Sequence, residues 1–225
     1  MRKAVQIREI IQNEYPEYQF SSDKFQKFND LLVLLEKWNQ QFNLTSIRDF
    51  DQMIEKHILD SMAFFNLFPP KNNNQIFSGK IIDIGSGAGL PGAVVSILNP
   101  ESNIISIDKS SKKIKFQEIL KQELQLENFH PLNIHLTQIY NIPEHQNSYT
   151  FILARAFDQI KGLFENGVKL LSPKGHLILW KGKKWQEELD QTPESLKNQY
   201  LLKKSATYQF GDGRFGGTIL LFQKK

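Results

Sequence analysis

The chain has 225 residues, of which 40% are hydrophobic and 23% charged, so it can bury a substantial core and does not have the composition of a disordered protein. It contains no cysteine, which excludes disulfides, thiolate nucleophiles and cysteine-ligated metal sites. The net charge of +4 permits a polyanionic partner without requiring one. The longest apolar run, Leu31 to Leu35, is far shorter than the about 20 residues that span a bilayer. The N-terminus lacks the apolar stretch of a signal peptide, so we expect a cytoplasmic protein that does not enter a membrane.

Residues 1 to about 68 are predicted to be helical. Two segments carry apolar residues at helical spacing, one from Phe25 to Trp38 behind a capping Ser21-Ser22-Asp23, the other from Met53 to Phe65. The second pattern ends at Pro69-Pro70, which cannot continue a helix, and a polar linker follows. No strand pattern precedes residue 80. We therefore expect a helical cap over residues 1–75 and a second domain over residues 76–225.

From residue 80 onward, short apolar runs alternate with helical patterns, which is typical of a parallel sheet covered on both faces. The tail instead carries two extended segments around a glycine-rich turn, which predicts an antiparallel hairpin. The fold class is therefore predicted as α/β, with a mostly parallel sheet of seven strands and an antiparallel C-terminal finish. The predicted strands are Lys80–Ile84, Asn103–Ile107, Leu132–Leu136, Tyr149–Leu153, His176–Trp180, Tyr200–Phe210 and Gly217–Phe222, and the predicted helices lie near 91–98, 111–124 and 159–171.

A glycine-rich loop follows the first predicted strand directly. Gly85, Gly87 and Gly89 stand at alternate positions, where the backbone can take dihedrals closed to other residues and approach a ligand closely. Asp108 ends the second predicted strand, where a carboxylate can accept hydrogen bonds from both hydroxyls of a ribose. The pattern therefore indicates a nucleoside ligand.

Two nucleoside ligands compete for this loop. The segment from Gly87 to Gly92 matches G-x-G-x-x-G, the dinucleotide fingerprint, which leaves an NAD-dependent oxidoreductase open as an alternative. However, Asp83 and Gly85 already occupy the turn that the fingerprint's first glycine normally takes. A carboxylate at the strand end repels a pyrophosphate but suits the cationic amino-acid group of S-adenosylmethionine. The loop therefore favours S-adenosylmethionine over NAD.

Five further segments, taken in order with the glycine loop, are similar to those of one family. They are Trp38-Asn39, Asn43-Leu44-Thr45, His57-Ile58-Leu59-Asp60-Ser61, Arg155-Ala156 and Lys181-Gly182. In order and spacing the chain resembles the RsmG (GidB) family of class I S-adenosylmethionine-dependent methyltransferases over nearly its whole length. The resemblance implies a Rossmann-like methyltransferase fold and methylation of N7 of a guanine in the decoding region of 16S ribosomal RNA. The expected partner is 16S rRNA or the small ribosomal subunit, bound by a monomer. A ribosomal RNA-binding protein without catalytic activity is the remaining alternative.

Candidate cofactor residues come from the loop chemistry together with the resemblance. The resemblance places Thr137 and Gln138 next to the adenine, where the side-chain carbonyl of Gln138 can accept from the adenine amino group. Arg155, after the fourth predicted strand, lies at the sheet edge where ligands of α/β folds bind, although a surface salt bridge is its ordinary role. The full set is Asp83, Gly85, Gly87, Gly89, Leu90, Asp108, Thr137, Gln138 and Arg155.

Methylation at guanine N7 needs no general base, because N7 carries a free lone pair at neutral pH. We therefore assign no catalytic acid or base and no metal, and expect catalysis by positioning. Phe157 is predicted either to stack on the RNA base or to be a core residue. His57 and Asp60, three apart, are expected to meet on one helical face and hold the 43–45 segment near the cofactor. Substrate-binding candidates are Asn43, Arg155, Phe157, Lys181, Lys183 and Lys184.

Overall fold

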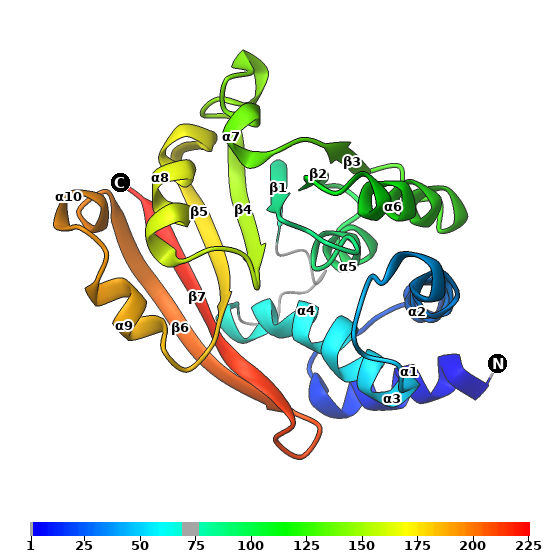
Figure 1. Cartoon of the computed structure of the whole chain (residues 1–225). Coiled ribbons are helices and arrows are strands. Elements are labelled where there is room, and N and C mark those ends of the chain that lie inside the picture. Colours follow the sequence, from blue (N-terminus) through cyan, green and yellow to red (C-terminus); the bar gives the residue numbers. More distant parts are fainter. Residues whose placement is uncertain (1, 69–76) are drawn as a thin grey trace.

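The computed structural model of the chain describes residues 2–68 and 77–225, and its centre is a seven-stranded sheet (Figure 1). The strand order is β3-β2-β1-β4-β5-β7-β6. The first five strands are parallel, whereas β7 runs antiparallel to both β5 and β6. The predicted class, α/β with an antiparallel C-terminal hairpin, is confirmed. The strands are β1 (Lys80–Ile84), β2 (Asn103–Asp108), β3 (Phe129–Asn133), β4 (Tyr149–Arg155), β5 (Leu171–Lys181), β6 (Tyr200–Phe210) and β7 (Phe215–Lys224).

The third strand lies three residues earlier in the chain than predicted. It spans Phe129–Asn133 instead of Leu132–Leu136, so it includes Pro131. A proline has no N–H to donate, but β3 lies at the sheet edge and pairs only with β2, which makes proline acceptable there. Strand β5 also begins earlier than predicted, at Leu171, because the preceding helix passes straight into it.

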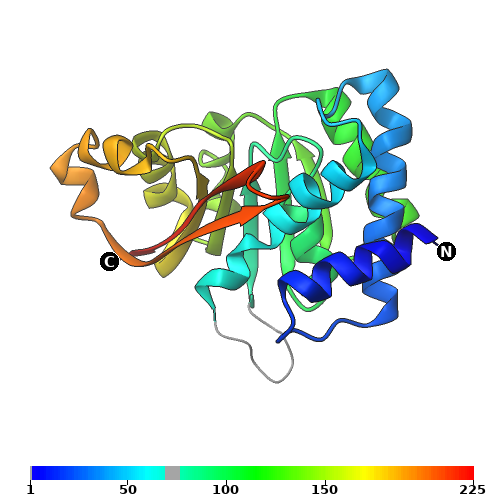
Figure 2. The same ribbon diagram turned by 90° about the horizontal axis from the view of Figure 1, so that it is seen from below.

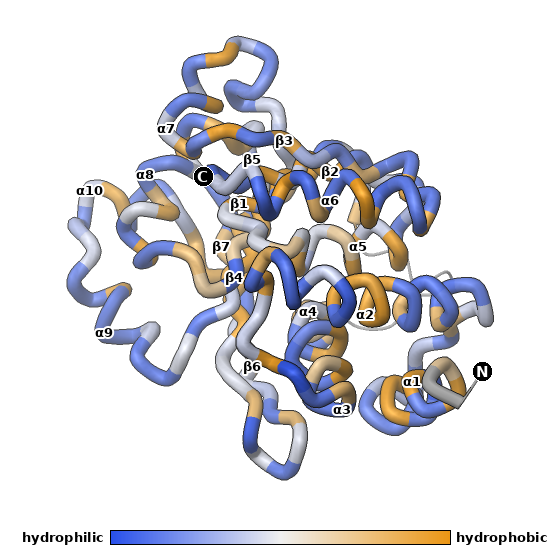
Figure 3. The backbone as a smooth tube through the Cα atoms, turned by 45° about the vertical axis from the view of Figure 1, so that its right-hand side comes forward, coloured by the Kyte–Doolittle hydropathy of each residue, from blue (hydrophilic) through white to orange (hydrophobic). Residues whose placement is uncertain are grey.

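Helices cover both faces of the sheet. On one face α5 and α6 pack beneath the N-terminal cap, and on the other lie α7 to α10 (Figure 1). The turns of α2 and α6 alternate between hydrophobic and hydrophilic residues in Figure 3, as expected for helices that bury one side. The bounds are α5 (Gly92–Leu98), α6 (Ser111–Glu123), α7 (Leu136–Ile139), the 3₁₀ turn η3 (Pro143–His145), α8 (Ile160–Leu170), α9 (Trp185–Asp190) and α10 (Glu194–Lys197).

The cap consists of two full helices and a broken third segment. The segment predicted as one helix is divided into α3, the π-helix η1, α4 and the 3₁₀-helix η2, and its last part contacts β6 and β7. Helix α2 lies across α5 and α6, as Figure 2 shows from below. The bounds are α1 (Arg2–Glu14), α2 (Ser22–Phe42), α3 (Phe50–Met53), η1 (Ile54–Leu59), α4 (Asp60–Met62) and η2 (Ala63–Leu67).

Cap and sheet share one hydrophobic core. The ring of Phe64 in the cap lies 4.9 Å from that of Phe77, which in turn lies 5.0 Å from Phe151 on β4. The predicted stop at Pro69-Pro70, the polar linker and the domain boundary after residue 75 fall outside the described residues, so the division into two domains stays a prediction. Within residues 2–68 and 77–225, none of the helices is long and apolar enough to cross a bilayer.

Candidate cofactor and substrate site

The turn after β1 carries the predicted glycine loop. Gly85, Gly87 and Gly89 have φ values of +66°, +60° and +85°, a backbone region that side-chain-bearing residues rarely adopt. A Cβ atom at Gly85 would also collide with the ring of Phe157. The expected conformational role of the alternate glycines is confirmed at these three positions.

Asp108 and Gln117 hold this loop against β2 and α6. The N–H of Gly87 donates to Oδ2 of Asp108 at 2.9 Å, and the N–H of Ser110 donates to Oδ1 at 2.8 Å. The buried Gln117 donates from Nε2 to the carbonyl of Gly87 at 2.8 Å and to Oγ of Ser86 at 2.9 Å. A carboxylate offers about four lone-pair positions, so Asp108 keeps acceptor capacity on its open side.

A first hollow of about 330 Å³ opens beside Asp108, which is 8% exposed. Apolar side chains from the loop after β3 and from the loop after β4 form its walls, and two lysines stand at its rim. This combination suits a nucleoside, with the flat base against the apolar walls and the vicinal hydroxyls of its sugar at Asp108. The lining residues are Gly85, Ile107, Asp108, Lys109, Lys113, Ile134, His135, Leu136, Ala156 and Phe157.

The pair predicted beside the adenine does not line this hollow. Thr137 and Gln138 lie in α7 with exposed side chains, and Oε1 of Gln138 accepts from the N–H of His135 at 3.3 Å. Their neighbours His135 and Leu136 line it instead. Strand β3 ends at Asn133, earlier than predicted, and α7 begins at Leu136. Thr137 therefore lies in a helix and not directly after the strand.

A second hollow, of about 300 Å³, lies on the other side of Gly85. The cap closes it with residues 44–47, Lys56 and His57, opposite the glycine loop and Arg155. The two hollows share Gly85, Lys113 and Ala156 in their walls, so they form adjoining parts of one site. Leu90, predicted as a cofactor contact, lines the second hollow.

Asn39 holds the cap segment that faces this second hollow. Its side chain, 2% exposed, donates to the carbonyl of Thr45 at 2.9 Å and accepts from the Thr45 N–H at 2.8 Å. The predicted substrate residue Asn43 is the left-handed C-cap of α2 (φ +50°) and is exposed beside the hollow rather than lining it. Among the described residues these hydrogen bonds to Thr45 come from Asn39 and not from His57 or Asp60, so the expectation that these two residues hold the segment is not met by any hydrogen bond.

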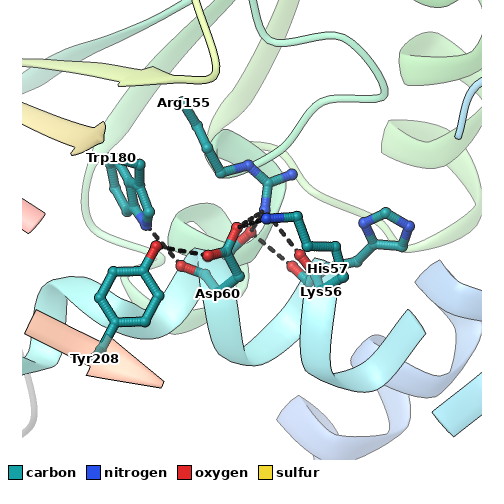
Figure 4. A network of polar contacts seen from close by, with 7 residues as sticks. Lys56, His57, Asp60, Arg155, Trp180 and Tyr208 are labelled. Atoms are coloured by element: carbon teal, nitrogen blue, oxygen red, sulfur yellow. Dashed lines mark hydrogen bonds and ion pairs between the residues drawn. The ribbon is translucent and has the colours of Figure 1, made fainter. Parts of the chain in front are cut away.

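Asp60 is the centre of a buried polar network (Figure 4). Its Oδ2 accepts from Arg155 Nη1 at 3.1 Å and from Lys56 Nζ at 3.2 Å, and its Oδ1 accepts from the Tyr208 hydroxyl at 2.6 Å. Trp180 Nε1 donates to the Asp60 carbonyl at 2.6 Å. Through these bonds the cap is joined to β4, β5 and β6 beside the site.

Arg155 is therefore anchored and does not extend freely into solvent. Its Nη1 also donates to the carbonyl of Lys56 and to Oγ of Ser61, both at 3.1 Å, and its side chain is 14% exposed. It separates the second hollow from a third, of about 220 Å³, whose walls include Trp180 and Tyr208. Its guanidinium thus belongs to the wall of the site, and its position there is set by the cap.

His57 and Asp60 do not meet as predicted. In the π-helix η1 the backbone bonds run five residues back, as from the N–H of Asp60 to the carbonyl of Glu55, and this wider turn separates side chains three apart. Asp60 turns to Arg155, whereas the His57 ring points away from that network in Figure 4. Neither ring nitrogen of His57 has a partner within the described part of the chain. Each such buried group costs about 1–3 kcal/mol.

Asp83 is fully buried beneath the glycine loop rather than exposed to a ligand. Its Oδ2 accepts from the N–H of Gly92 at 2.8 Å, and a Cβ atom at Gly92 would lie 2.7 Å from that oxygen. Asp83 is not among the residues lining the hollows. The carboxyl group therefore fixes the start of α5, and the predicted contact with an amino-acid group has no open path in this conformation.

We expect the variant Asp83→Asn to gain stability relative to the unchanged protein as the pH rises. Burial raises the pKa of Asp83 to about 7, with a smaller contribution from Asp108, although the Gly92 amide and the Arg155 charge oppose the shift. The unfolded carboxyl ionises near its ordinary value of 3.8, so the folded protein holds an extra proton between that pH and about 7. Asp83 thus favours folding at low pH and loses that contribution as the pH rises.

The slope is about 1.4 kcal/mol per pH unit and flattens near pH 7, so the difference in the free energy of unfolding between Asp83→Asn and the unchanged protein should grow by roughly 2 kcal/mol from about pH 5 to 7. The asparagine keeps an oxygen for the Gly92 amide, so the fold is preserved. Denaturant unfolding at several pH values measures the difference. A difference that is constant with pH would contradict the raised pKa.

The residues after β4 and β5 that are predicted to contact RNA differ in their surroundings: some are exposed, and others are bound to neighbouring parts of the chain. Phe157 lies over Gly85 and lines the first hollow, flanked by Ala156 and Asp158 at φ +52° and +51°. Lys181 is 8% exposed and donates to Glu188 and to the carbonyl of Asp158, both at 2.7 Å. It therefore fixes the loop that carries Phe157, and its prediction as an exposed RNA contact does not agree with this geometry.

Lys183 and Lys184 are exposed in the turn between β5 and α9, so they are placed where a polyanion can reach them. In the described residues, histidine, aspartate and glutamate side chains form no group of three suited to a metal ion.

Comparison with known proteins agrees with this architecture. The family model GidB, described as rRNA small subunit methyltransferase G, matches residues 24–212. The chain belongs to the GidB family. It is 39% identical to the ribosomal RNA small subunit methyltransferase G of Hydrogenovibrio crunogenus, over 76% of this chain and 74% of that protein. It is 33% identical to the protein of the same name from Mycoplasma capricolum, over 94% of this chain and 87% of that protein.

Solved structures resemble this GidB-family chain in fold. A chain of the fibrillarin/Nop5p complex has a TM-score of 0.56 at 14% identity, covering 76% of this chain and 81% of that one. A protein from Methanococcus maripaludis, described as an S-adenosyl-L-methionine-dependent methyltransferase, has a TM-score of 0.55 at 14% identity and covers 92% of this chain and 95% of its own. The predicted methyltransferase fold is confirmed.

Proposed function

We propose that this GidB-family chain transfers a methyl group from S-adenosylmethionine to N7 of a guanine in 16S rRNA. The observation that carries the proposal is the pair of hollows that adjoin at Gly85. One has the chemistry for an adenosyl group, and the other lies between the glycine loop and the cap. The same membership makes the chain an enzyme of small-subunit rRNA methylation, in place of the NAD-dependent oxidoreductase that the glycine motif left open.

The first hollow fits the adenosyl group of the cofactor. Asp108 retains lone pairs toward the hollow after accepting two backbone N–H groups, and these can accept both ribose hydroxyls. Ile134, Leu136 and Phe157 supply apolar surface for the adenine ring. The missing Cβ at Gly85 leaves the backbone open where the two hollows join. Thr137 and Gln138 directly follow Leu136, which lines this hollow, and their role beside the adenine stays a prediction.

Catalysis in this site requires positioning and no proton transfer. Bound S-adenosylmethionine supplies a methyl group on a sulfonium, which the guanine N7 lone pair attacks in line. Asp108 and the loop that it holds fix the donor from one side. Residues 44–47 and Arg155, each held by partly buried hydrogen bonds, fix the wall on the acceptor side.

Three exposed residues that do not line the two hollows are candidates for contact with the RNA backbone. Lys183 and Lys184 project from the turn after β5, and Asn43 lies at the cap edge. Phosphate contacts of this kind bind without reading sequence and weaken with salt. Phe157 stays a candidate for stacking, although its ring faces the adenosine side of the site.

The decisive experiment offers the protein labelled S-adenosylmethionine and small-subunit RNA, both naked and in assembled particles, and maps the product by mass spectrometry. We expect one 7-methylguanine in 16S rRNA. Binding of RNA and S-adenosylhomocysteine without methyl transfer would instead support the catalytically inactive alternative. Calorimetric binding of NADH but not S-adenosylhomocysteine would support the oxidoreductase.

The variant Asp108→Asn should bind S-adenosylhomocysteine about 10- to 100-fold more weakly, because hydrogen bonds to a charged acceptor contribute about 1.5–3 kcal/mol. The asparagine NH₂ would also face a backbone N–H of Gly87 or Ser110 where the carboxylate accepts both. Isothermal calorimetry measures the loss. Glu118→Gln, an exposed position on α6, serves as the matched control and should bind as the unchanged protein does. Equal affinities of the two variants would rule out a ribose contact at Asp108.

A further inference from the structure

His57 combines burial with unsatisfied hydrogen bonding in the wall of the second hollow. The residue is 6% exposed, lines the hollow, and has no partner for either ring nitrogen among the described residues. Asp60, three residues on, is by contrast saturated with bonds from Arg155, Lys56 and Tyr208. A buried polar group without a partner is destabilising, so its presence beside a binding site indicates a partner that arrives from outside the chain.

The imidazole is neutral in this position. Burial, together with the smaller effects of the cations Arg155 and Lys56, lowers the pKa of His57 to about 3, and Asp60 opposes this shift in part. A neutral imidazole has one N–H donor and one acceptor nitrogen. It can therefore donate to an acceptor or accept from a donor with the nitrogen that faces the base, and it adds no positive charge to the hollow.

We propose that His57 hydrogen-bonds the O6–N1 edge of the target guanine and thereby orients N7 toward the methyl donor. The inference rests on the proposed function, because it takes the second hollow as the guanine site. In guanine, O6 accepts hydrogen bonds and N1–H donates. A neutral histidine can use either member of the guanine edge, and the edge leaves N7 free.

The charge balance of the reaction also favours a neutral side chain. The S–CH₃ bond breaks and the N7–CH₃ bond forms, the bonding pair stays on sulfur, and no proton moves. The positive charge therefore passes from sulfur to the base. A protonated imidazole beside that base would oppose the change by Coulomb repulsion, whereas Asp60 already neutralises part of the charge of Arg155 and Lys56.

The ring must turn to reach the base, since surrounding atoms cover both of its nitrogens here. The side chain already lines the hollow, which places the ring next to the space that the base would enter. The π-helix η1 separates His57 from the Asp60 network, which leaves the imidazole without intramolecular bonds to break. Irregular helical turns of this kind are frequent at functional sites.

The test compares His57→Leu with His57→Asn in the full-length protein. Leucine removes both nitrogens and leaves no unpaired polar group, so the unfolding temperature should stay the same or rise. Affinity for S-adenosylhomocysteine should be unchanged, while kcat/KM for methyl transfer to small-subunit RNA should fall about 10- to 100-fold. Asparagine keeps one donor and one acceptor and should recover part of the loss. The control His176→Leu, on β5 where the ring stacks 5.4 Å from Phe151, should retain full transfer.

Methyl transfer by His57→Leu within about threefold of the unchanged protein would overturn the inference. The inference would also be overturned if His57→Leu lowered the unfolding temperature, the affinity for S-adenosylhomocysteine and the rate of methyl transfer all at once. That result would mean that His57 has a structural role. If the unchanged protein binds S-adenosylhomocysteine but methylates no guanine, the proposed function itself fails. The ¹⁵N signals of the His57 ring then decide separately: a shift when small-subunit RNA is added supports the contact, and no shift refutes it.

Discussion

Replacing Gly85 by alanine should abolish binding of S-adenosylhomocysteine and methyl transfer. The residue has φ +66°, which costs a residue with a side chain about 1–2 kcal/mol. The added Cβ atom would collide with the ring of Phe157, so either the ring or the loop must move. Both line the first hollow, and the loop is also bonded to Asp108. We therefore expect affinity to fall by about 100-fold or more, since a loop displaced from Asp108 loses several contacts at once.

Gly182→Ala is the matched control for this variant. Gly182 follows β5 at the same edge of the sheet, and a Cβ atom there would meet nothing within 4 Å. Calorimetry should show unchanged affinity for Gly182→Ala. The double variant Gly85→Ala with Phe157→Ala removes the collision but keeps the backbone strain, so it should recover affinity only in part. Binding by Gly85→Ala within about threefold of the unchanged protein would show that the loop does not approach the cofactor.

The conformation of the glycine loop was predictable from the sequence, because it depends on a few neighbouring residues. A turn that needs three left-handed residues selects glycine at Gly85, Gly87 and Gly89, and a strand end followed by such a turn predicts a ligand at the carboxyl edge of the sheet. The alternation of strands and helices, with an antiparallel finish, was likewise predictable from periodicity. The third strand was not, because its place depends on β3 being an edge strand, which makes Pro131 tolerable.

The structure of the cap where it faces the site was much harder to predict from the sequence. A helical pattern from Met53 to Phe65 predicts a single helix, but tertiary contacts divide it into α, π and 3₁₀ turns. Lys56 stands four residues before Asp60 within the cap, but the other partners come from β4, β5 and β6, so no spacing within the cap predicts them. Lys181 is a similar case. Its position in a run of cationic residues predicts a contact with RNA, but in the structure it forms an ion pair with Glu188. Local patterns can show which residues are charged, and only the fold decides whether a charge is paired.

The second large effect is expected for Asp60→Asn. The side chain of Asp60 is 2% exposed and accepts from two cations and one hydroxyl. Asparagine removes the charge and places an NH₂ group against donors, which leaves Arg155 and Lys56 without a carboxylate. Breaking a buried ion pair by removing one partner costs about 3–5 kcal/mol, so the free energy of unfolding should fall by about that amount. Methyl transfer should fall too, because Arg155 loses the bond that places it in the wall of the second hollow.

An ion pair between the same cap segment and the turn after β6 shows why burial, and not the presence of an ion pair, decides the size of this effect. Glu55 lies five residues before Asp60 on η1 and pairs at 3.3 Å with Arg214, whose side chain is 55% exposed. Solvent screens such a pair, so Glu55→Gln should cost less than about 1 kcal/mol in denaturant unfolding. Tyr208→Phe removes one bond to the Asp60 charge and should fall between the two, at about 1.5–3 kcal/mol. If Asp60→Asn costs no more than Glu55→Gln, the network joins cap and sheet in geometry without stabilising their contact, and Arg155 must be held by the remaining bonds to Lys56 and Ser61.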